Sequence, residues 1–297
     1  MSNGTNRVLL LIVLLIAFSL RVYGIGWDSG FYAHPDERHI IDVTVNRVHL
    51  TLDLGKLLDA DSSPLNPRRL ENGVRLSYSY GTLLIYFLKA VSNLVAKVLG
   101  QQYAEFESIY VVARSISAIA DTLTVLFIYL LALRLFGART GIIAALLSAF
   151  SVIQIQFAHF YVAEPIMTLL LVISLWFAVS AIQDHKNYKF ALSGLFLGFA
   201  IATKPSAAAF CPALLLLLAI RSLESRISGI FSSGESIAST LMLVARRLTY
   251  VLPATVLAWA IWEPYALLDF PTYAQNIVAE SQIQRGIIDV PYTRQYI

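Results

Sequence analysis

Residues 8–20 read VLLLIVLLIAFSL, an unbroken apolar run with Arg7 before it and Arg21 after it. With its flanks, the run is long enough for a helix that crosses a membrane. No small-x-small cleavage site follows it, so we expect a retained first helix rather than a removed signal peptide. Similar runs recur along the 297 residues, of which 57% are hydrophobic and 14% charged. A soluble domain is about a quarter charged, so we predict an all-α, multi-pass transmembrane helical bundle.

Two features of the composition exclude other classes of protein. The net charge is only +3, which gives no support to nucleic-acid binding. The chain has a single cysteine, Cys211, so an intrachain disulfide and a cysteine-rich metal site are both excluded.

Hydropathy predicts about seven spans in all. Those after the first lie at residues 109–136, 142–157, 165–182, 190–202, 207–220 and 248–262. A long polar stretch, residues 25–107, separates the first span from the second, and its Gly, Pro and Asp residues are typical of loops and short helices. We expect a second polar loop at residues 221–247.

Residues 82–98 are apolar enough for a further span, but their pattern is that of a helix lying in the membrane interface. Polar side chains recur on one helical stripe, at Thr82, Tyr86, Lys89, Asn93 and Lys97. Apolar side chains occupy the other face, as in a helix that lies flat on a bilayer. The alternative is a membrane span whose polar face is buried in the bundle.

The distribution of basic residues favours the interfacial interpretation. If the N-terminus is cytoplasmic and residues 82–98 do not cross, every short basic loop faces the cytoplasm, as the positive-inside rule requires. These loops are residues 134–139, 184–189 and 221–247. The outer segments are then residues 25–107, 159–164, 203–205 and 263–297. If residues 82–98 did cross, every later loop would change sides and the basic loops would face outward.

The first outer segment contains His34-Pro35-Asp36-Glu37-Arg38-His39, with two adjacent carboxylates between imidazoles. The predicted topology brings this stretch to the same membrane surface as Arg114, Glu164 and Lys204. Each of these charges also has a purely structural explanation. An arginine can extend to the lipid headgroups, and a carboxylate is favourable in the first turn of a helix. Ionisable groups at membrane depth are costly, however, and several of them at one surface suggest a functional site.

Such a site suits the transfer of a sugar from a polyprenyl phosphate. The leaving group is already a phosphate, so it needs cations rather than an acid, and Arg114 and Lys204 could supply them. The acceptor hydroxyl needs one carboxylate as general base, for which Asp36 or Glu37 could serve. Direct attack opposite the phosphate would invert the anomeric centre. A glycosidase, by contrast, would need a carboxylic acid as well.

The chain resembles the N-terminal half of a GT-C superfamily membrane glycosyltransferase of the protein O-mannosyltransferase-like, polyprenyl-phosphate-sugar-dependent kind. The resemblance runs through most of the 297 residues, as an ordered set of short motifs at matching spacing. The motifs are Leu20-Arg21, Asp36-Glu37, Tyr80-Gly81, Val112-Ala113-Arg114-Ser115, Leu133-Arg134-Leu135-Phe136-Gly137, Ala158-His159, Glu164, the stretch from Gly194 to Lys204, and Glu263-Pro264-Tyr265.

The resemblance implies one GT-C-type transmembrane catalytic domain over residues 1–297, incomplete at its C-terminus, with the active site on the extracytoplasmic face. It implies that Asp36 and Glu37 form the catalytic acidic motif and that Arg114, Glu164 and Lys204 line the site. We assign the donor phosphate to Arg114 and Lys204, and substrate contacts to Glu164, His159 and His34. The expected partners are a polyprenyl-phosphate-linked sugar, membrane lipids and a protein, lipid or glycan acceptor.

No cofactor is required by this chemistry, although His34, Asp36, His39 and His159 could together hold a divalent metal.

Two other functions stay open. A transporter or flippase for a lipid-linked or anionic substrate would fit broken helices at Glu164-Pro165 and Lys204-Pro205, but no internal repeat is evident. A non-catalytic membrane subunit is the third possibility. The lack of paired cysteines and the short termini favour a prokaryotic plasma membrane.

Overall fold

The computed structural model describes residues 3–49, 51, 53–71, 73–77, 79–227 and 237–288. This part of the chain is helical and contains no β-strand, which confirms the predicted all-α class. The long helices are α1 (Asn3–Val22), α4 (Thr82–Leu99), α5 (Ile109–Phe136), α6 (Ala138–Ala149), α8 (Ala163–Asp184), α9 (Asn187–Thr203), α10 (Cys211–Ile227), α11 (Ile237–Trp262) and α13 (Phe270–Gln284). The shorter ones are α2 (Pro35–Asp42), α3 (Leu54–Leu57), α7 (Val152–Ala158) and α12 (Pro264–Leu268).

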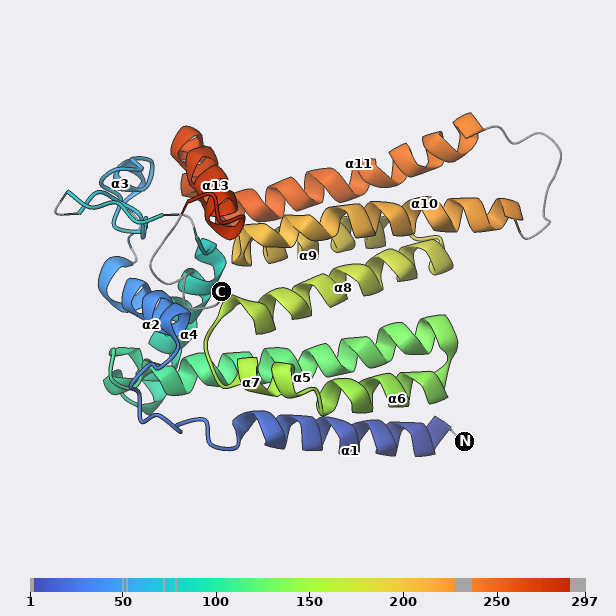
Figure 1. Cartoon of the computed structure of the whole chain (residues 1–297), viewed down its shortest axis with the longest axis horizontal. Coiled ribbons are helices and arrows are strands. Elements are labelled where there is room, and N and C mark those ends of the chain that lie inside the picture. Colours follow the sequence, from blue (N-terminus) through green and yellow to red (C-terminus); the bar gives the residue numbers. More distant parts are fainter. Residues whose placement is uncertain are drawn as a thin grey trace.

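Helices α1, α5, α6, α8, α9, α10 and α11 run side by side along the long axis of the molecule (Figure 1). Among the described residues, five helices are long and apolar enough to cross a membrane: Gly4–Val22, Thr82–Leu99, Ile109–Phe136, Ala163–Asp184 and Leu241–Trp262. A sixth span is possible if α6 and α7 are counted together. These helices support a multi-pass membrane protein, and the predicted total of about seven spans stays a prediction.

Two predicted segments differ from the observed helices. The span expected at residues 142–157 is broken between α6 and α7, which meet at 57°. Helix α6 ends at Ala149, where Phe150 caps it with a bond from its amide to the Leu146 carbonyl, and Ser151 is the N-cap of α7. The loop expected at residues 221–247 is mostly helical, because α10 continues to Ile227 and α11 begins at Ile237. Residues 228–236 of that predicted loop lie outside the described residues.

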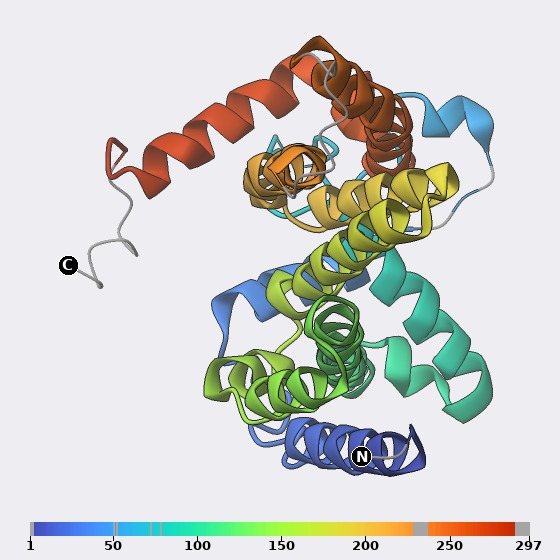
Figure 2. The ribbon, with the colours of Figure 1, turned by 90° about the vertical axis from the view of Figure 1, so that its right-hand side faces the viewer.

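Helix α4 lies across one end of the bundle rather than along it, as Figures 1 and 2 together show. Leu84, Leu88 and Ala96 are buried against the bundle, whereas Leu94 and Val98 are exposed. The helix therefore has a buried face and an exposed apolar face, and a helix in the membrane interface would turn the second toward lipid. The interfacial position of residues 82–98 stays a prediction, because this helix is also long and apolar enough to cross a membrane.

Small residues allow α9 and α11 to pack closely. A side chain at Gly194 or Gly198, four residues apart on α9, would overlap the carbonyl oxygens of Val251 and Thr255 on α11. The Thr255 hydroxyl donates to the Gly194 carbonyl at 3.0 Å. Close approach at small residues is the usual way in which helices associate inside membranes, where lipid removes the hydrophobic drive for contact.

A buried ion pair joins α1 to α5. Arg21 donates from Nε to Asp121, and its Nη1 reaches the carbonyls of Ala17 at 3.0 Å and Ala149 at 3.1 Å. Its Nη2 lies 3.3 Å from the Ser148 carbonyl. Arg21 therefore also satisfies carbonyls at the end of α6, just where the broken span bends. This contact anchors the start of the loop that leads from α1 to the candidate site.

Candidate active site

All the site residues predicted from the sequence lie at one end of the bundle, where α2 and α4 cross it (Figure 1). Asp36 and Glu37 are in the first turn of α2, and Arg114 is near the start of α5. Glu164 is in the first turn of α8, and Lys204 follows directly after α9. Residues from four separate parts of the sequence are thus gathered at one end.

Arg114 is the centre of a saturated ion-pair network. Its Nε and Nη2 donate to the two carboxylate oxygens of Glu37, at 2.8 and 2.7 Å. Its Nη1 and Nη2 donate to Asp28 at 2.8 and 2.9 Å, and Nη1 also donates to the Ile25 carbonyl at 3.0 Å. A guanidinium has five N–H donors, so a phosphate could bind Arg114 only by displacing one of these acceptors.

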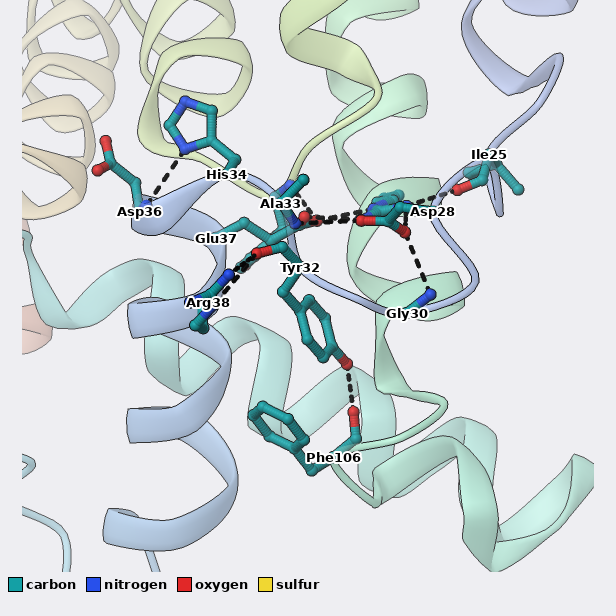
Figure 3. Close-up of polar contacts among 12 residues, drawn as sticks. Ile25, Asp28, Gly30, Tyr32, Ala33, His34, Asp36, Glu37, Arg38 and Phe106 are labelled. Carbon is teal, nitrogen blue, oxygen red and sulfur yellow. Dashed lines mark hydrogen bonds and ion pairs between the residues drawn. The ribbon is translucent and has the colours of Figure 1, made fainter.

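Asp28 is a part of this network that the sequence analysis treated only as loop. Besides Arg114, its carboxylate accepts the amides of Gly30 at 3.1 Å and Ala33 at 3.2 Å, as Figure 3 shows. The hydrogen bond from Arg114 lowers the pKa of the Asp28 carboxyl, and the two amides act in the same direction. The only signal in the sequence was a lone acid between glycines, which is also typical of ordinary turns.

Glu37 is fully enclosed by protein. Its side chain is 0% exposed, and the oxygen that binds Arg114 Nε also accepts the amide of Tyr161 at 2.9 Å. An acceptor hydroxyl could approach Glu37 only if these bonds opened. The geometry therefore fits a residue that holds the loops together better than it fits a general base.

Asp36, by contrast, is half-buried and points away from the Glu37 and Asp28 carboxylates (Figure 3). Its amide donates to Nδ1 of His34 at 3.2 Å, and Pro35 occupies the first helical position, so this turn of α2 is well defined. The His34 ring packs on Phe160, with ring centroids 4.9 Å apart. Burial, and after it the nearby Asp36 carboxylate, raises the pKa of the Tyr80 hydroxyl.

Lys204 and Glu164 form an ion pair at the same end of the bundle. The distance from Lys204 Nζ to Glu164 Oε1 is 2.8 Å, and the side chains are 24% and 27% exposed, so the pair is reached by solvent. Lys204 Nζ also lies 5.8 Å from the centre of the Tyr80 ring. Tyr80 therefore lies near both Asp36 and the Lys204 ammonium.

Residues 80–82 are clamped between the ends of α9 and α11. The Gly81 amide donates to the Thr203 carbonyl at 3.0 Å, and any side chain at Gly81 would overlap the Ala202 carbonyl. The Thr82 amide donates to Oε1 of Glu263 at 2.5 Å. Glu263 is buried beside Arg68, and burial raises the pKa of its carboxyl.

Arg68, Glu263 and Tyr80 are site residues that the sequence analysis did not assign. Arg68 donates to the carbonyl of Tyr80 and, at 3.1 Å, to that of Ser77. Tyr80-Gly81 and Glu263-Pro264 were noted only as motifs of the family resemblance. Nothing in their spacing indicated that the two motifs meet.

The histidines take different positions. The ring nitrogens of His159 lie within hydrogen-bonding distance of two backbone carbonyl oxygens, Nε2 at 2.8 Å from Tyr23 and Nδ1 at 2.7 Å from Ile155, so His159 lies between the loop after α1 and α7. Burial lowers the pKa of His39, whose ring lies 6.0 Å from that of Tyr80. Nowhere in the described part of the chain do three or more His, Cys, Asp or Glu residues come together as a metal site. The geometry gives no support to a metal held by His34, Asp36, His39 and His159.

An apolar groove of about 460 Å³ lies between α4, α5, α8, α9 and α11. Its lining includes Leu83, Ile116, Leu123, Ile166, Phe199 and Trp262. Leu83 is three residues from Tyr80, and Ile166 is two residues from Glu164, so the groove begins next to the charged cluster. Groove and cluster together form one site with an ionic part and an apolar part.

These features define a multi-pass helical membrane protein whose candidate site joins acids and a lysine to an apolar groove. Residues 103–250 match the family model described as dolichyl-phosphate-mannose-protein mannosyltransferase. This match confirms the resemblance predicted from the sequence. The match indicates a mannosyltransferase-like membrane glycosyltransferase, and it includes Arg114, His159, Glu164 and Lys204. No curated protein matches the chain.

Proposed function

We propose that this protein transfers a hexose or related sugar from a polyprenyl-phosphate carrier to an acceptor hydroxyl, with inversion at the anomeric carbon. The observation that supports this best is the placement of Asp36, Tyr80 and the Lys204–Glu164 pair beside the apolar groove. The family match over residues 103–250 supports the same reaction class.

Asp36 is the general base in this proposal. It is the half-buried member of the acidic pair, whereas both oxygens of Glu37 are bonded to Arg114. The acceptor O–H gives its proton to Asp36 as the oxygen forms a bond to the anomeric carbon. The bond from that carbon to the phosphate oxygen breaks, and its electron pair leaves with the phosphate.

Lys204 holds the donor phosphate. It is a partly exposed cation at the site, and its partner Glu164 places it by a single 2.8 Å contact. An ammonium at this position neutralises the charge that develops on the departing phosphate. Arg114 is a positioning residue rather than a phosphate ligand, because Asp28 and Glu37 already occupy its donors.

The groove takes the first isoprenoid units of the carrier. Its lining is almost entirely apolar, and it begins within a few residues of Glu164 and Tyr80. A lipid whose phosphate binds Lys204 therefore has an apolar path directly beside it. Apolar lining with few polar groups at one end is the usual design of a lipid or cofactor site.

The site faces the extracytoplasmic side in this proposal. The basic residues Arg134 and Lys189 lie at the far end of the bundle from Asp36, where both pair with Asp184. The positive-inside rule assigns that end to the cytoplasm. The acceptor is then a hydroxyl of a protein, lipid or glycan outside the cell, and the family match favours a protein.

The test is transfer from a panel of radiolabelled polyprenyl-phosphate sugars, in membranes from cells that express the protein or its Asp36→Asn variant. Loss of a general base is expected to slow transfer by about 100-fold or more. Asp42→Asn is the matched control, since Asp42 is an exposed acid of the same helix whose side chain binds Asn46. Transfer at the wild-type rate by Asp36→Asn, or no transfer by the wild type from any donor, would overturn the proposal.

A further inference from the structure

Tyr80 lies near both halves of the proposed site, the base Asp36 and the cation Lys204. The Lys204 ammonium lies 5.8 Å from the centre of the Tyr80 ring, and the Asp36 carboxylate is near enough to the Tyr80 hydroxyl to raise the pKa of that hydroxyl. The carboxylate of Glu164, which pairs with Lys204, also acts on the Tyr80 hydroxyl electrostatically. The base and the phosphate-binding cation therefore share a single aromatic neighbour.

The backbone at Tyr80 is fixed independently of these contacts. Arg68 donates to the Tyr80 carbonyl, and the next residue, Gly81, is bonded to Thr203 at the end of α9. Lys204 is the residue directly after Thr203. The same contact that fixes the position of Tyr80 therefore also fixes the start of the segment that presents Lys204.

We propose that Tyr80 is a positioning residue whose hydroxyl orients the Asp36 carboxylate and whose ring face supports the Lys204 ammonium. The inference rests on the proposed function, since it concerns the same base and the same cation. It assigns Tyr80 two separable tasks. The hydroxyl affects catalysis through Asp36, and the ring affects donor binding through Lys204.

The chemistry of the hydroxyl supports the first task. Burial is the main cause that raises the pKa of the Tyr80 hydroxyl, and the neighbouring Asp36 carboxylate is the next. The hydroxyl therefore stays protonated and acts as a donor, not as a base. A carboxylate has two oxygens, so a tyrosine that holds one of them leaves the other for the acceptor hydroxyl.

The geometry of the ring supports the second task. An ammonium over an aromatic face is attracted by the ring's quadrupole, by an amount that grows as water is excluded. Lys204 is also paired with Glu164, and a donor phosphate competes for the same ammonium. A ring that holds Lys204 from another side keeps the ammonium in place when the phosphate weakens its bond to Glu164.

The test compares Tyr80→Phe, which removes only the hydroxyl, with Tyr80→Leu, which also removes the ring. We expect Tyr80→Phe to lower kcat by about tenfold while the KM for the donor stays within twofold. We expect Tyr80→Leu to lower kcat likewise and to raise the donor KM about fivefold. Tyr86→Phe is the matched control, because its hydroxyl donates to the Leu65 carbonyl at 3.2 Å.

A second readout does not depend on turnover. The protein in detergent is titrated with a short polyprenyl monophosphate. We expect the wild type and Tyr80→Phe to bind this probe equally well. Tyr80→Leu should bind it more weakly, and Lys204→Gln most weakly of all. Equal binding by Tyr80→Leu and the wild type, or an unchanged kcat in Tyr80→Phe, would refute the role of Tyr80. If Asp36→Asn is inactive while both Tyr80 variants are normal, only this inference fails. If the wild type neither binds the probe nor transfers sugar, the proposed function fails and the inference falls with it.

Discussion

Arg114 and Glu37 form a two-point ion pair that water does not reach. Nε meets Oε1 at 2.8 Å and Nη2 meets Oε2 at 2.7 Å, with both side chains 0% exposed. Burying two charges is costly, and only a complete set of hydrogen bonds offsets the loss of water. Asp28, Ile25 and Tyr161 complete that set, so the pair joins the loop after α1, the start of α2, α5 and the segment before α8.

The first prediction concerns this network. Arg114→Lys cannot keep two-point bonds to two carboxylates, so we expect it to destabilise the fold by about 3–5 kcal/mol. Thermal unfolding in detergent measures the change, and Arg139→Lys, at an exposed position, is the control. An unchanged melting temperature with a raised donor KM would instead support the role first predicted from the sequence, a phosphate ligand.

The second prediction concerns Asp28 and acid pH. The pKa of its carboxyl is lowered from the ordinary value of 3.8, so its contribution to stability is fully present above that value. It is lost as the pH falls through the lower, folded-state pKa. We expect Asp28→Asn to be less stable than the wild type at neutral pH, and the difference to shrink as the pH falls below about 4. Unfolding measured against pH tests this, and a difference that grows toward acid would contradict it.

The third prediction concerns Gly81, whose backbone touches that of Ala202. Gly81→Ala must push the start of α4 away from the end of α9, because the added carbon would overlap a carbonyl rather than a movable side chain. We expect a loss of about 1–3 kcal/mol in stability and a lower transfer rate. Gly55→Ala is the control, since its nearest neighbour is a side-chain oxygen of Asp53 at 3.4 Å. Equal behaviour of the two variants would mean that the Tyr80 segment tolerates displacement.

The fourth prediction concerns the apolar groove. Leu123→Trp places a larger side chain in the lining, so we expect the donor KM to rise several-fold for a long polyprenyl chain and to change little for a two-isoprene analogue. Leu133→Trp, farther along α5 and outside that lining, is the control. An equal effect on both donors would argue that the chain binds elsewhere.

The fifth prediction concerns the Arg21–Asp121 ion pair inside the bundle. Asp121→Asn leaves Arg21 buried without its countercharge, and we expect about 3–5 kcal/mol of destabilisation. Asp184→Asn, at the exposed end of α8, should cost under about 1 kcal/mol. Similar melting temperatures for these two variants would show that the carbonyls of Ser148 and Ala149 suffice to satisfy Arg21.

Much of the architecture was predictable from local pattern. The apolar runs predict membrane helices because hydropathy and length act over a single segment, and the basic loops lie at the end of the bundle away from Asp36. The break between α6 and α7 was missed, because hydropathy is the same for a straight and for a bent apolar segment. The helical ends beside residues 228–236 were missed, because charged residues continue a helix beyond the apolar part of a span.

The sequence by itself determined the class of this protein and the set of charged residues at one end of its bundle. Only the tertiary structure decided which of them are enclosed in the Arg114 network and which stay partly exposed. Asp36 and Glu37 are neighbours in sequence, but successive helical positions point about 100° apart. Glu37 therefore enters the Arg114 network, whereas Asp36 lies near Tyr80, whose ring is beside Lys204. Such a division depends on contacts between residues far apart in the chain, which no local pattern contains.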